Sequence, residues 1–231
     1  MKKRLSKKKK EFAKIFSEQK KYTIKQALCI LEKIKVFSKF NESVDVFIKL
    51  NINPKKTEQN IRGYSTLPHG NGKKKKIAVF SRENIKELKK IGANFVGMED
   101  LVNLFKNNTI QVDLVLAKPD SMSIISQIGQ ILGPKGLMPN LKSGTLTNNL
   151  FESLKNFKKK QILYKNDKNG IIHTSIGKIN FESYKIEENI RYFIQSIQKN
   201  KPNSVKGNFI KNFGLCTTMG PGIKIEMSDI I

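Results

Sequence analysis

The hydrophobic and polar positions of this chain follow two different rhythms, and the first begins after a lysine-rich start. Residues 22–35, YTIKQALCILEKIK, repeat apolar positions every three or four residues, which predicts a helix with Thr23 as its N-cap. Residues 43–51, SVDVFIKLN, alternate apolar and polar side chains, which predicts a strand with one buried face. The residues expected to face the core are Ala27, Leu28, Leu31 and Ile34 of the helix and Val44, Val46, Ile48 and Leu50 of the strand.

The second rhythm begins after the turn-forming and charged residues 64–76, YSTLPHGNGKKKK. Strands are expected over 75–80, 93–97 and 112–117, and helices over 82–92, 98–108 and 121–132. Strands that alternate with helices imply right-handed crossovers and a parallel sheet covered on both faces. The sequence therefore predicts an inserted three-layer α/β domain over residues 68–158.

The first rhythm returns towards the C-terminus. The pattern predicts a helix over 149–160, a hairpin around the turn DKNG at 167–170, a long helix over 183–201 stopped by Pro202, and two strands within 208–227 joined by the turn TMGPG. These elements are α+β in character, like the first sixty residues. Residues 1–67 and 159–231 are therefore expected to form one discontinuous α+β domain, with the α/β domain looped out of it.

Net charge directs attention to polyanions as partners. The chain has 44 Lys and Arg against 19 Asp and Glu, a formal net charge of +25, and residues 1–21 form a basic arm that is helical or frayed. Such an excess attracts nucleic acid or an anionic membrane surface over long range. An AT-rich coding sequence would also enrich lysine, but this origin would not remove the physical effect.

Several chemical classes lack support in the sequence. No stretch fits the phosphate loop G-x-x-x-x-G-K-[ST]: Gly72-Lys73 and Gly177-Lys178 lack the first glycine, and Pro134 follows Gly133 where lysine is needed. Two cysteines and two histidines without metal-ligand spacing argue against a zinc site, and Cys29 is expected to be a buried, reduced thiol. There is no secretory h-region and no apolar run near the ~18 residues that span a bilayer. We expect no catalysis, cofactor, metal or membrane partner.

The stretch GQILGPKGLMPN, residues 129–140, is rich in residues that shape the backbone. A helix is expected to end near Leu132, with Gly133 in a left-handed cap and Pro134 preventing its continuation. Gly136 and Pro139 would fix two further turns, and Leu137 and Met138 would anchor the loop in the core. On these grounds alone a structural loop is the better interpretation.

Two short segments have the composition of an RNA contact. Lys39, Phe40 and Ser43 place a cation, an aromatic ring and a hydroxyl just before a strand, which suits base stacking with phosphate contact. A phenylalanine packed as a hydrophobic staple is an equal alternative. The turn TTMGPG offers two hydroxyls, a thioether and a bare backbone at Gly220, although an ordinary hairpin turn would look the same.

These segments together resemble the L-one family of ribosomal proteins of the large subunit. The resemblance rests on LGPKGLMPN followed by KSGTLT, on QNIRG with LPHGNGK, and on TTMGP, and it runs in order from about residue 22 to 225. It implies two domains joined by two hinge strands, one domain being built from both termini. The family signature loop corresponds to Gly129, Leu132, Gly133, Pro134, Lys135, Gly136, Leu137, Met138, Pro139 and Asn140.

The resemblance also implies which residues contact ribosomal RNA. Those before the first strand are Lys39, Phe40, Ser43 and Asp45, and those of the C-terminal turn are Thr217, Thr218, Met219 and Gly220. The hairpin of the family appears here as KNDKNG, which contributes Lys165 and Lys168. Lysine keeps the charge of the family's arginine but not its two-pronged geometry.

The function implied by the resemblance is that of a structural constituent of the large subunit. Such a protein would bind rRNA at the mobile stalk and assist release of deacylated tRNA from the exit site. It would be monomeric outside the ribosome, and in bacteria it would often also repress translation of its own messenger RNA. The AT-rich bias of the coding sequence suggests that the ribosome concerned lies in the cytoplasm of a reduced-genome bacterium, or in a plastid or mitochondrion. Two other functional classes are alternatives: a free-standing translational repressor, which would need the same RNA surface, and an RNA-modifying enzyme, which would need a cofactor loop or catalytic dyad that the sequence lacks.

Overall fold

The computed structural model describes residues 12, 17, 20–35 and 38–229, so most of the predicted basic arm lies outside the described residues. The chain divides into two compact units: Met1–Gly72 with Ile162–Ile231, hereafter unit 1, and Lys73–Gln161, hereafter unit 2. The crossings fall at 72/73 and 161/162, whereas 67/68 and 158/159 were expected. Residues 67–72 stay with unit 1 because the buried Asn189 side chain accepts from the His69 N–H at 3.1 Å and donates to the Gly70 carbonyl at 2.9 Å.

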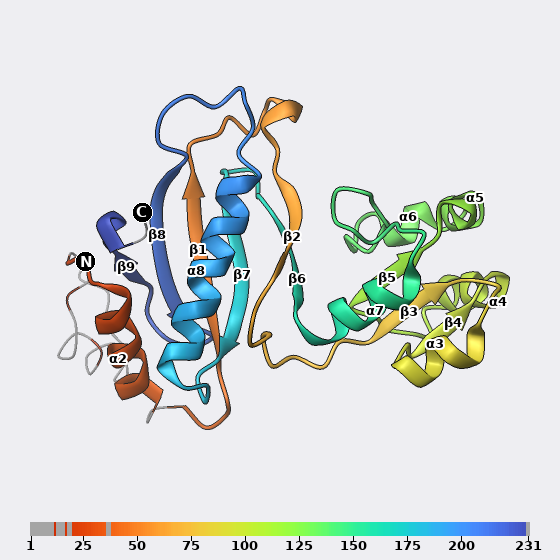
Figure 1. Ribbon diagram of the computed structural model, residues 1–231, viewed down its shortest axis with the longest axis horizontal. Helices are drawn as coiled ribbons and strands as arrows, with labels where there is room; N and C mark the ends of the chain where they lie inside the picture. Colours follow the sequence, from red (N-terminus) through yellow and green to blue (C-terminus); the bar gives the residue numbers. More distant parts are fainter. Residues whose placement is uncertain (1–11, 13–16, 18–19, 36–37, 230–231) are drawn as a thin grey trace, which may run out of the picture. The chain divides into compact units, whose positions relative to one another are not determined.

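Unit 1 is built on a four-stranded antiparallel sheet in the order β7-β1-β8-β9 (Figure 1). The strands are β1 (Ser43–Leu50), β7 (Ile171–Lys178), β8 (Ile210–Thr217) and β9 (Ile223–Ile225), so both ends of the chain contribute to one sheet. Helices α2 (Ile24–Ile34) and α8 (Ser183–Lys199) contact each other and cover one face. The alternation predicted for β1 is confirmed, since Val44, Val46, Ile48 and Leu50 are all buried.

Helix α2 begins as predicted. The Thr23 side chain accepts from the Gln26 N–H, and the Gln26 side chain accepts from the Thr23 N–H, which completes a capping box. The four predicted core residues are buried. The expectation for Cys29 was wrong: its thiol is exposed, because it lies on the face of the helix opposite Leu28 and Leu31.

The predicted hairpin around DKNG forms at its tip, where the Asp167 N–H donates to the Ile171 carbonyl at 2.9 Å, but it does not extend into a ladder. Strand β6 (Gln161–Lys165) pairs with β2 (Arg62–Thr66) in a separate two-stranded sheet, and its pairing towards β7 stops at the bridge between Asn166 and Ile172. The buried Asn166 side chain makes this bend, because its Oδ1 accepts from the Ile61 N–H at 2.7 Å. Strand β2, which precedes the first crossing, and β6, which begins at the second, therefore lie side by side.

Unit 2 contains the predicted parallel sheet, in the order β4-β3-β5. Its strands are β3 (Ile77–Phe80), β4 (Phe95–Gly97) and β5 (Leu114–Ala117), and every residue of β3 and β5 is buried. Helices α3 (Ile85–Ile91) and α7 (Leu150–Lys159) pack together on one face, and α4 (Glu99–Lys106) and α5 (Met122–Ser126) on the other (Figure 1). The α/β prediction for this part of the chain is confirmed.

The helix predicted over 121–132 is broken into pieces. A 3-10 turn, η3 (Pro119–Ser121), leads into α5, and α6 (Gly129–Leu132) follows separately. The break occurs at Ile128, where the backbone leaves helical geometry with φ −109° and ψ 15°, one residue before the weak helix former Gly129. A glycine at the start of a short helix therefore divides what the apolar pattern alone presents as one element.

Gly133 is not the left-handed cap that the sequence predicts. Its φ of −59° and ψ of −58° are helical, and the left-handed residue is Gly136, with φ +70°. The Leu137 N–H donates to the Leu132 carbonyl and the Gly136 N–H to the Gly133 carbonyl, both at 3.0 Å, which is the Schellman pattern. The anchors are confirmed, since Leu137 and Met138 pack against the core of unit 2.

Candidate nucleic-acid interface

The two RNA-contact segments named from the sequence meet at one end of the unit 1 sheet. Val44 of β1 pairs with Thr217 of β8, and beyond this pair two hydrogen bonds join the segments. The Ser43 N–H donates to Thr218 Oγ1 at 3.1 Å, and the Thr218 N–H donates to the Ser43 carbonyl at 3.2 Å. Residues 38–43 and 217–220 therefore form one surface, which we call the strand-end surface.

Two large apolar side chains stand out from the strand-end surface. Phe40 is 55% exposed and Met219 is 65% exposed. The exposure of Phe40 excludes the packed hydrophobic staple that the sequence left open. The backbone that carries the ring is held by a hydrogen bond, because the Ser38 hydroxyl donates to the Phe40 carbonyl at 3.0 Å. Exposed aromatic and thioether side chains on a backbone fixed by hydrogen bonds suit a base-stacking contact.

The turn that carries Met219 is tightly built. Thr217 is only 2% exposed, and its Oγ1 has no hydrogen-bond partner among the described residues. A Cβ added at Gly220 would collide with this Oγ1, and the Gly220 N–H donates to the Thr217 carbonyl at 3.1 Å. Glycine is therefore required for the turn to close over Thr217, and Thr217 acts on the surface by shaping it.

Lys178 is a candidate contact that reasoning from sequence missed. The pairing of β7 with β1 sets it opposite Ser43, and its Nζ donates to the Ser43 hydroxyl at 3.0 Å. The sequence drew attention to Gly177-Lys178 only as a failed phosphate loop. The register of β1 with β7 brings this cation to the strand-end surface. No local sequence pattern predicts that register.

Asp45 lies on the sheet face that α2 and α8 leave uncovered, where it pairs with Cys216 on one side and Ser175 on the other. Burial raises the pKa of the Cys216 thiol, and the negative charge of Asp45 raises it further. Cys216 therefore stays a neutral thiol at physiological pH. A carboxylate here can accept a hydrogen bond from a ribose hydroxyl or a base amino group, but it would repel phosphate.

Lys165 and Lys168 do not join the strand-end surface. The Leu50 N–H donates to the Gly170 carbonyl at 2.9 Å, so their turn lies at the opposite end of β1 from Ser43. At about 3.3 Å per residue, the eight residues of β1 separate the two ends by roughly 20 Å. Asp167 holds the turn by accepting from the Asn169 and Ile171 N–H groups at 2.8 Å, and the bond from Ile171 is the main reason that the pKa of Asp167 is lowered.

Residues 129–140, which we call the Gly/Pro stretch, lie in unit 2, where polar groups of this stretch and of the residues after it bond to one another. The Asn140 N–H donates to Thr145 Oγ1 at 2.8 Å, and the Lys142 N–H donates to Asn140 Oδ1 at 2.8 Å. Ser143 and Thr145 are buried beneath them, and Lys135 reaches Asn108 Oδ1 at 3.1 Å. These hydrogen bonds within unit 2 fix the conformation of the loop.

The described residues show neither a metal-ligand cluster nor a membrane span. Among them, no three His, Cys, Asp or Glu side chains gather as metal ligands would. Within the same part of the chain, no helix combines the length and apolar character needed to cross a bilayer.

Comparisons with known proteins agree with this architecture. A model of the Ribosomal protein L1p/L10e family matches residues 30–221. The chain is 51% identical over 229 residues to the large ribosomal subunit protein uL1 of Buchnera aphidicola subsp. Baizongia pistaciae, which covers 99% of this chain and 98% of the relative. It is 45% and 44% identical to the proteins of the same name from Pasteurella multocida and Haemophilus influenzae, over 98% of this chain and 99% of each relative. The chain therefore belongs to the ribosomal protein L1p/L10e family.

Proposed function

We propose that this protein is a structural constituent of the large ribosomal subunit and binds rRNA with the strand-end surface of unit 1. The observation that carries the proposal is the pair of exposed side chains, Phe40 and Met219, on two segments joined by hydrogen bonds. The names of its relatives, which place them in the large subunit, support the assignment to the ribosome. A net charge of +25 supports a polyanionic partner.

Each part of the surface has a distinct task in this proposal. Phe40 and Met219 contact exposed bases, and Lys39 and Lys178 contact phosphates. Asp45 accepts a hydrogen bond from a base or a ribose, and Gly220 lets the RNA backbone approach the turn. Because Ser43, Thr218 and the turn are already hydrogen bonded to one another, little conformational entropy is lost on binding.

Lys165 and Lys168 would form a second contact. Their turn lies roughly 20 Å from Ser43 along β1, so it would reach a different segment of RNA from the one on Phe40. With two separated contacts, unit 1 could hold stalk rRNA while exit-site tRNA passes, which is the tRNA-release role that the family resemblance implies.

The decisive test is Met219→Asp. It removes an apolar contact and places a carboxylate against RNA, so affinity for a stalk rRNA fragment should fall about 10- to 100-fold, or about 1.4 to 2.8 kcal/mol. Met219→Leu should keep most of the affinity. Tyr192→Asp makes the same kind of change at another exposed side chain, on α8, and should alter binding less than about threefold. Filter binding at fixed salt measures all three, with circular dichroism to confirm folding.

If Met219→Asp binds as well as the natural protein, the strand-end surface is not the RNA site. The same preparations separate rRNA binding from repression of the protein's own messenger. A messenger fragment that competes for the same surface with comparable affinity supports the repressor role, and co-sedimentation of the native protein with large subunits supports the structural one.

A further inference from the structure

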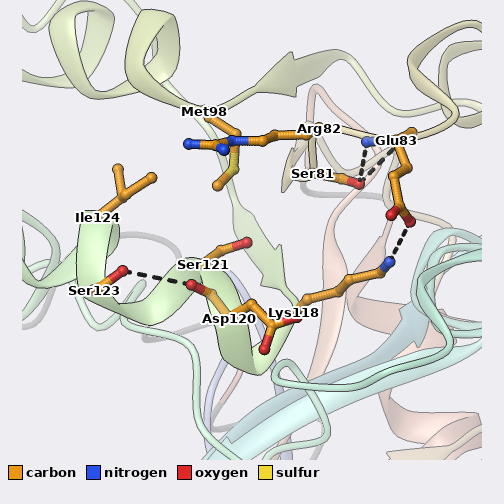
Figure 2. Close-up of a pocket in the computed structure, with 9 residues that line it drawn as sticks. All are labelled: Ser81, Arg82, Glu83, Met98, Lys118, Asp120, Ser121, Ser123 and Ile124. Atoms are coloured by element: carbon orange, nitrogen blue, oxygen red, sulfur yellow. Dashed lines mark hydrogen bonds and ion pairs between the residues drawn. The ribbon is translucent and has the colours of Figure 1, made fainter.

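Unit 2 has a pocket at the carboxyl edge of its parallel sheet that the RNA site on unit 1 does not use. It encloses about 250 Å³ and is lined mainly by residues that follow the strands: Ser81, Arg82 and Glu83 after β3, Met98 after β4, and Lys118, Asp120 and Ser121 after β5 (Figure 2). No motif in the sequence marks this set of residues as a site.

The topology explains why a pocket opens here. From the central strand β3 the chain continues into α3 on one face of the sheet, whereas from β5 it continues into α5 on the other face. The two connections diverge, so a crevice is left between them at the carboxyl ends of the strands. In open α/β sheets, a divergence of this kind is where ligands bind.

The cations of the pocket are in two different states. Lys118 Nζ is 2.6 Å from Glu83 Oε2, which fixes its ammonium group at the rim. Among the residues that the structure describes, Arg82 has neither a hydrogen bond nor an ion pair, and its guanidinium group extends past Met98 into the pocket (Figure 2). An unpaired guanidinium beside a fixed ammonium is suited to a phosphate group.

The opposite wall offers polar groups of another kind. Asp120, Ser121 and Ser123 lie across from Arg82 (Figure 2). The buried Ser121 hydroxyl donates to the Phe80 carbonyl at 3.3 Å, which leaves its oxygen lone pairs free to accept. The carboxylate of Asp120 can accept only, so it suits a hydroxyl donor and repels a second anion.

We propose that this pocket binds a ribose-phosphate unit, with Arg82 and Lys118 on the phosphate and Asp120 on a ribose hydroxyl. The guanidinium group of Arg82 and the carboxylate of Asp120 then each have a partner, because a sugar hydroxyl and a phosphate lie a few ångströms apart in every ribonucleotide. Inorganic phosphate would satisfy only the cations, and a deoxyribonucleotide would lose the 2′-hydroxyl that distinguishes RNA from DNA. The unit can come from an RNA chain or from a free ribonucleotide.

The test is a titration of the full chain followed by amide NMR. The probes are adenosine 5′-monophosphate, its 2′-deoxy analogue, inorganic phosphate and an oligoadenylate of four nucleotides. We expect saturable shifts at the amides of residues 81–83, 118, 120 and 121 with a Kd on the order of 1 mM for the monophosphate. The deoxy analogue should bind about fivefold more weakly, and inorganic phosphate weaker still.

Two double variants of equal charge separate a built site from general attraction to lysine. Arg82→Gln with Lys118→Gln should abolish the saturable shifts, whereas Lys90→Gln with Lys106→Gln, which neutralises two exposed lysines of α3 and α4, should preserve them. Tighter binding of the oligoadenylate than of the monophosphate at the same amides identifies RNA as the source, and equal binding identifies the free nucleotide.

The proposal is overturned if the shifts are not saturable, if all probes act alike, or if both double variants weaken binding equally. Its failure would leave the RNA site of unit 1 untouched, because the Met219→Asp test reads a different surface. Conversely, a neutral Met219→Asp would leave the pocket titration unaffected.

Discussion

Lys75 differs from its neighbours in the run KKKK because its side chain is partly buried, whereas theirs are exposed. Its Nζ donates to the Gln161 carbonyl, so the lysine joins the two ends of unit 2 where the chain enters and leaves it. Burial lowers the pKa of Lys75 to about 8; the negative charge of Asp113 acts against this shift, and the positive charge of Lys73 adds to it. The ammonium group is therefore held in a place where its charged form is costly.

We expect the stability of the protein to rise with pH between about 8 and 10.5 through this lysine. In that window the unfolded chain still binds the proton that the folded chain has lost, so the free energy of unfolding increases with pH. Lys75→Met should flatten the rise in urea unfolding midpoints, and Lys74→Met, at an exposed neighbour, should keep it. If both variants behave alike, Lys75 is not the group responsible.

At the scale of one element, the Gly/Pro stretch shows how a single backbone angle sets a loop. Gly136 has φ +70° and open space around its Cα, whereas Gly133 is helical and packs closely on the Gly129 carbonyl, 2.8 Å from where a Cβ would lie. The two glycines are therefore required for different reasons: one for a left-handed turn and the other for a close approach.

Substitutions in this stretch should test the left-handed turn at Gly136. Gly136→Ala forces a side chain into the left-handed region and should cost about 1 kcal/mol, while Gly136→Asn should cost less, because asparagine tolerates that region. Gly129→Ala, in α6 with no atom within 4 Å of the added Cβ, should be neutral or slightly stabilising. Urea unfolding measures each; a Gly136→Ala protein as stable as Gly129→Ala would contradict the loop geometry.

At the scale of the whole molecule, the sheet of unit 1 needs both ends of the chain. Strand β1 comes from the first part and lies between β7 and β8 from the last, while β2 and β6 run side by side where the chain leaves and returns. Unit 2 contributes no strand to this sheet. The strand-end surface is therefore complete within unit 1.

Deleting residues 73–161 and joining the flanks with a short Gly/Ser linker should leave a folded, RNA-binding protein. Lys75 Nζ donates to the Gln161 carbonyl, so the two ends of the deleted segment lie close together and a short linker can join the flanks at little entropic cost. Affinity for the stalk rRNA fragment should stay within about threefold of the full chain, and Met219→Asp in the shortened chain should weaken it as in the full one. A cooperatively folded deletion protein that has lost specific binding would move the site to unit 2.

Most helices and strands, and the change from one fold type to the other, were predictable from local sequence patterns. Apolar periodicity located α2, α8 and β1, and the change to alternating strands and helices predicted the parallel sheet of unit 2, because burial of one face leaves a local pattern of period 3.6 or 2. The segments around Phe40 and Met219 were also recognisable, because an aromatic, a cation and a glycine turn are local in sequence.

The contacts between residues that are distant in sequence were not predictable in this way. The β1–β7 register brought Lys178 to Ser43, and the pairing of β6 with β2 replaced the expected hairpin and left Lys165 at the far end of the sheet. The pocket with Arg82 and Lys118 likewise depends on two loops that one sheet edge brings together, and Glu83 and Lys118, which pair across it, are 35 residues apart in the sequence. Local pattern states which face of a strand is buried, but strand partners and register follow from packing energies summed over the whole unit, which no short segment contains.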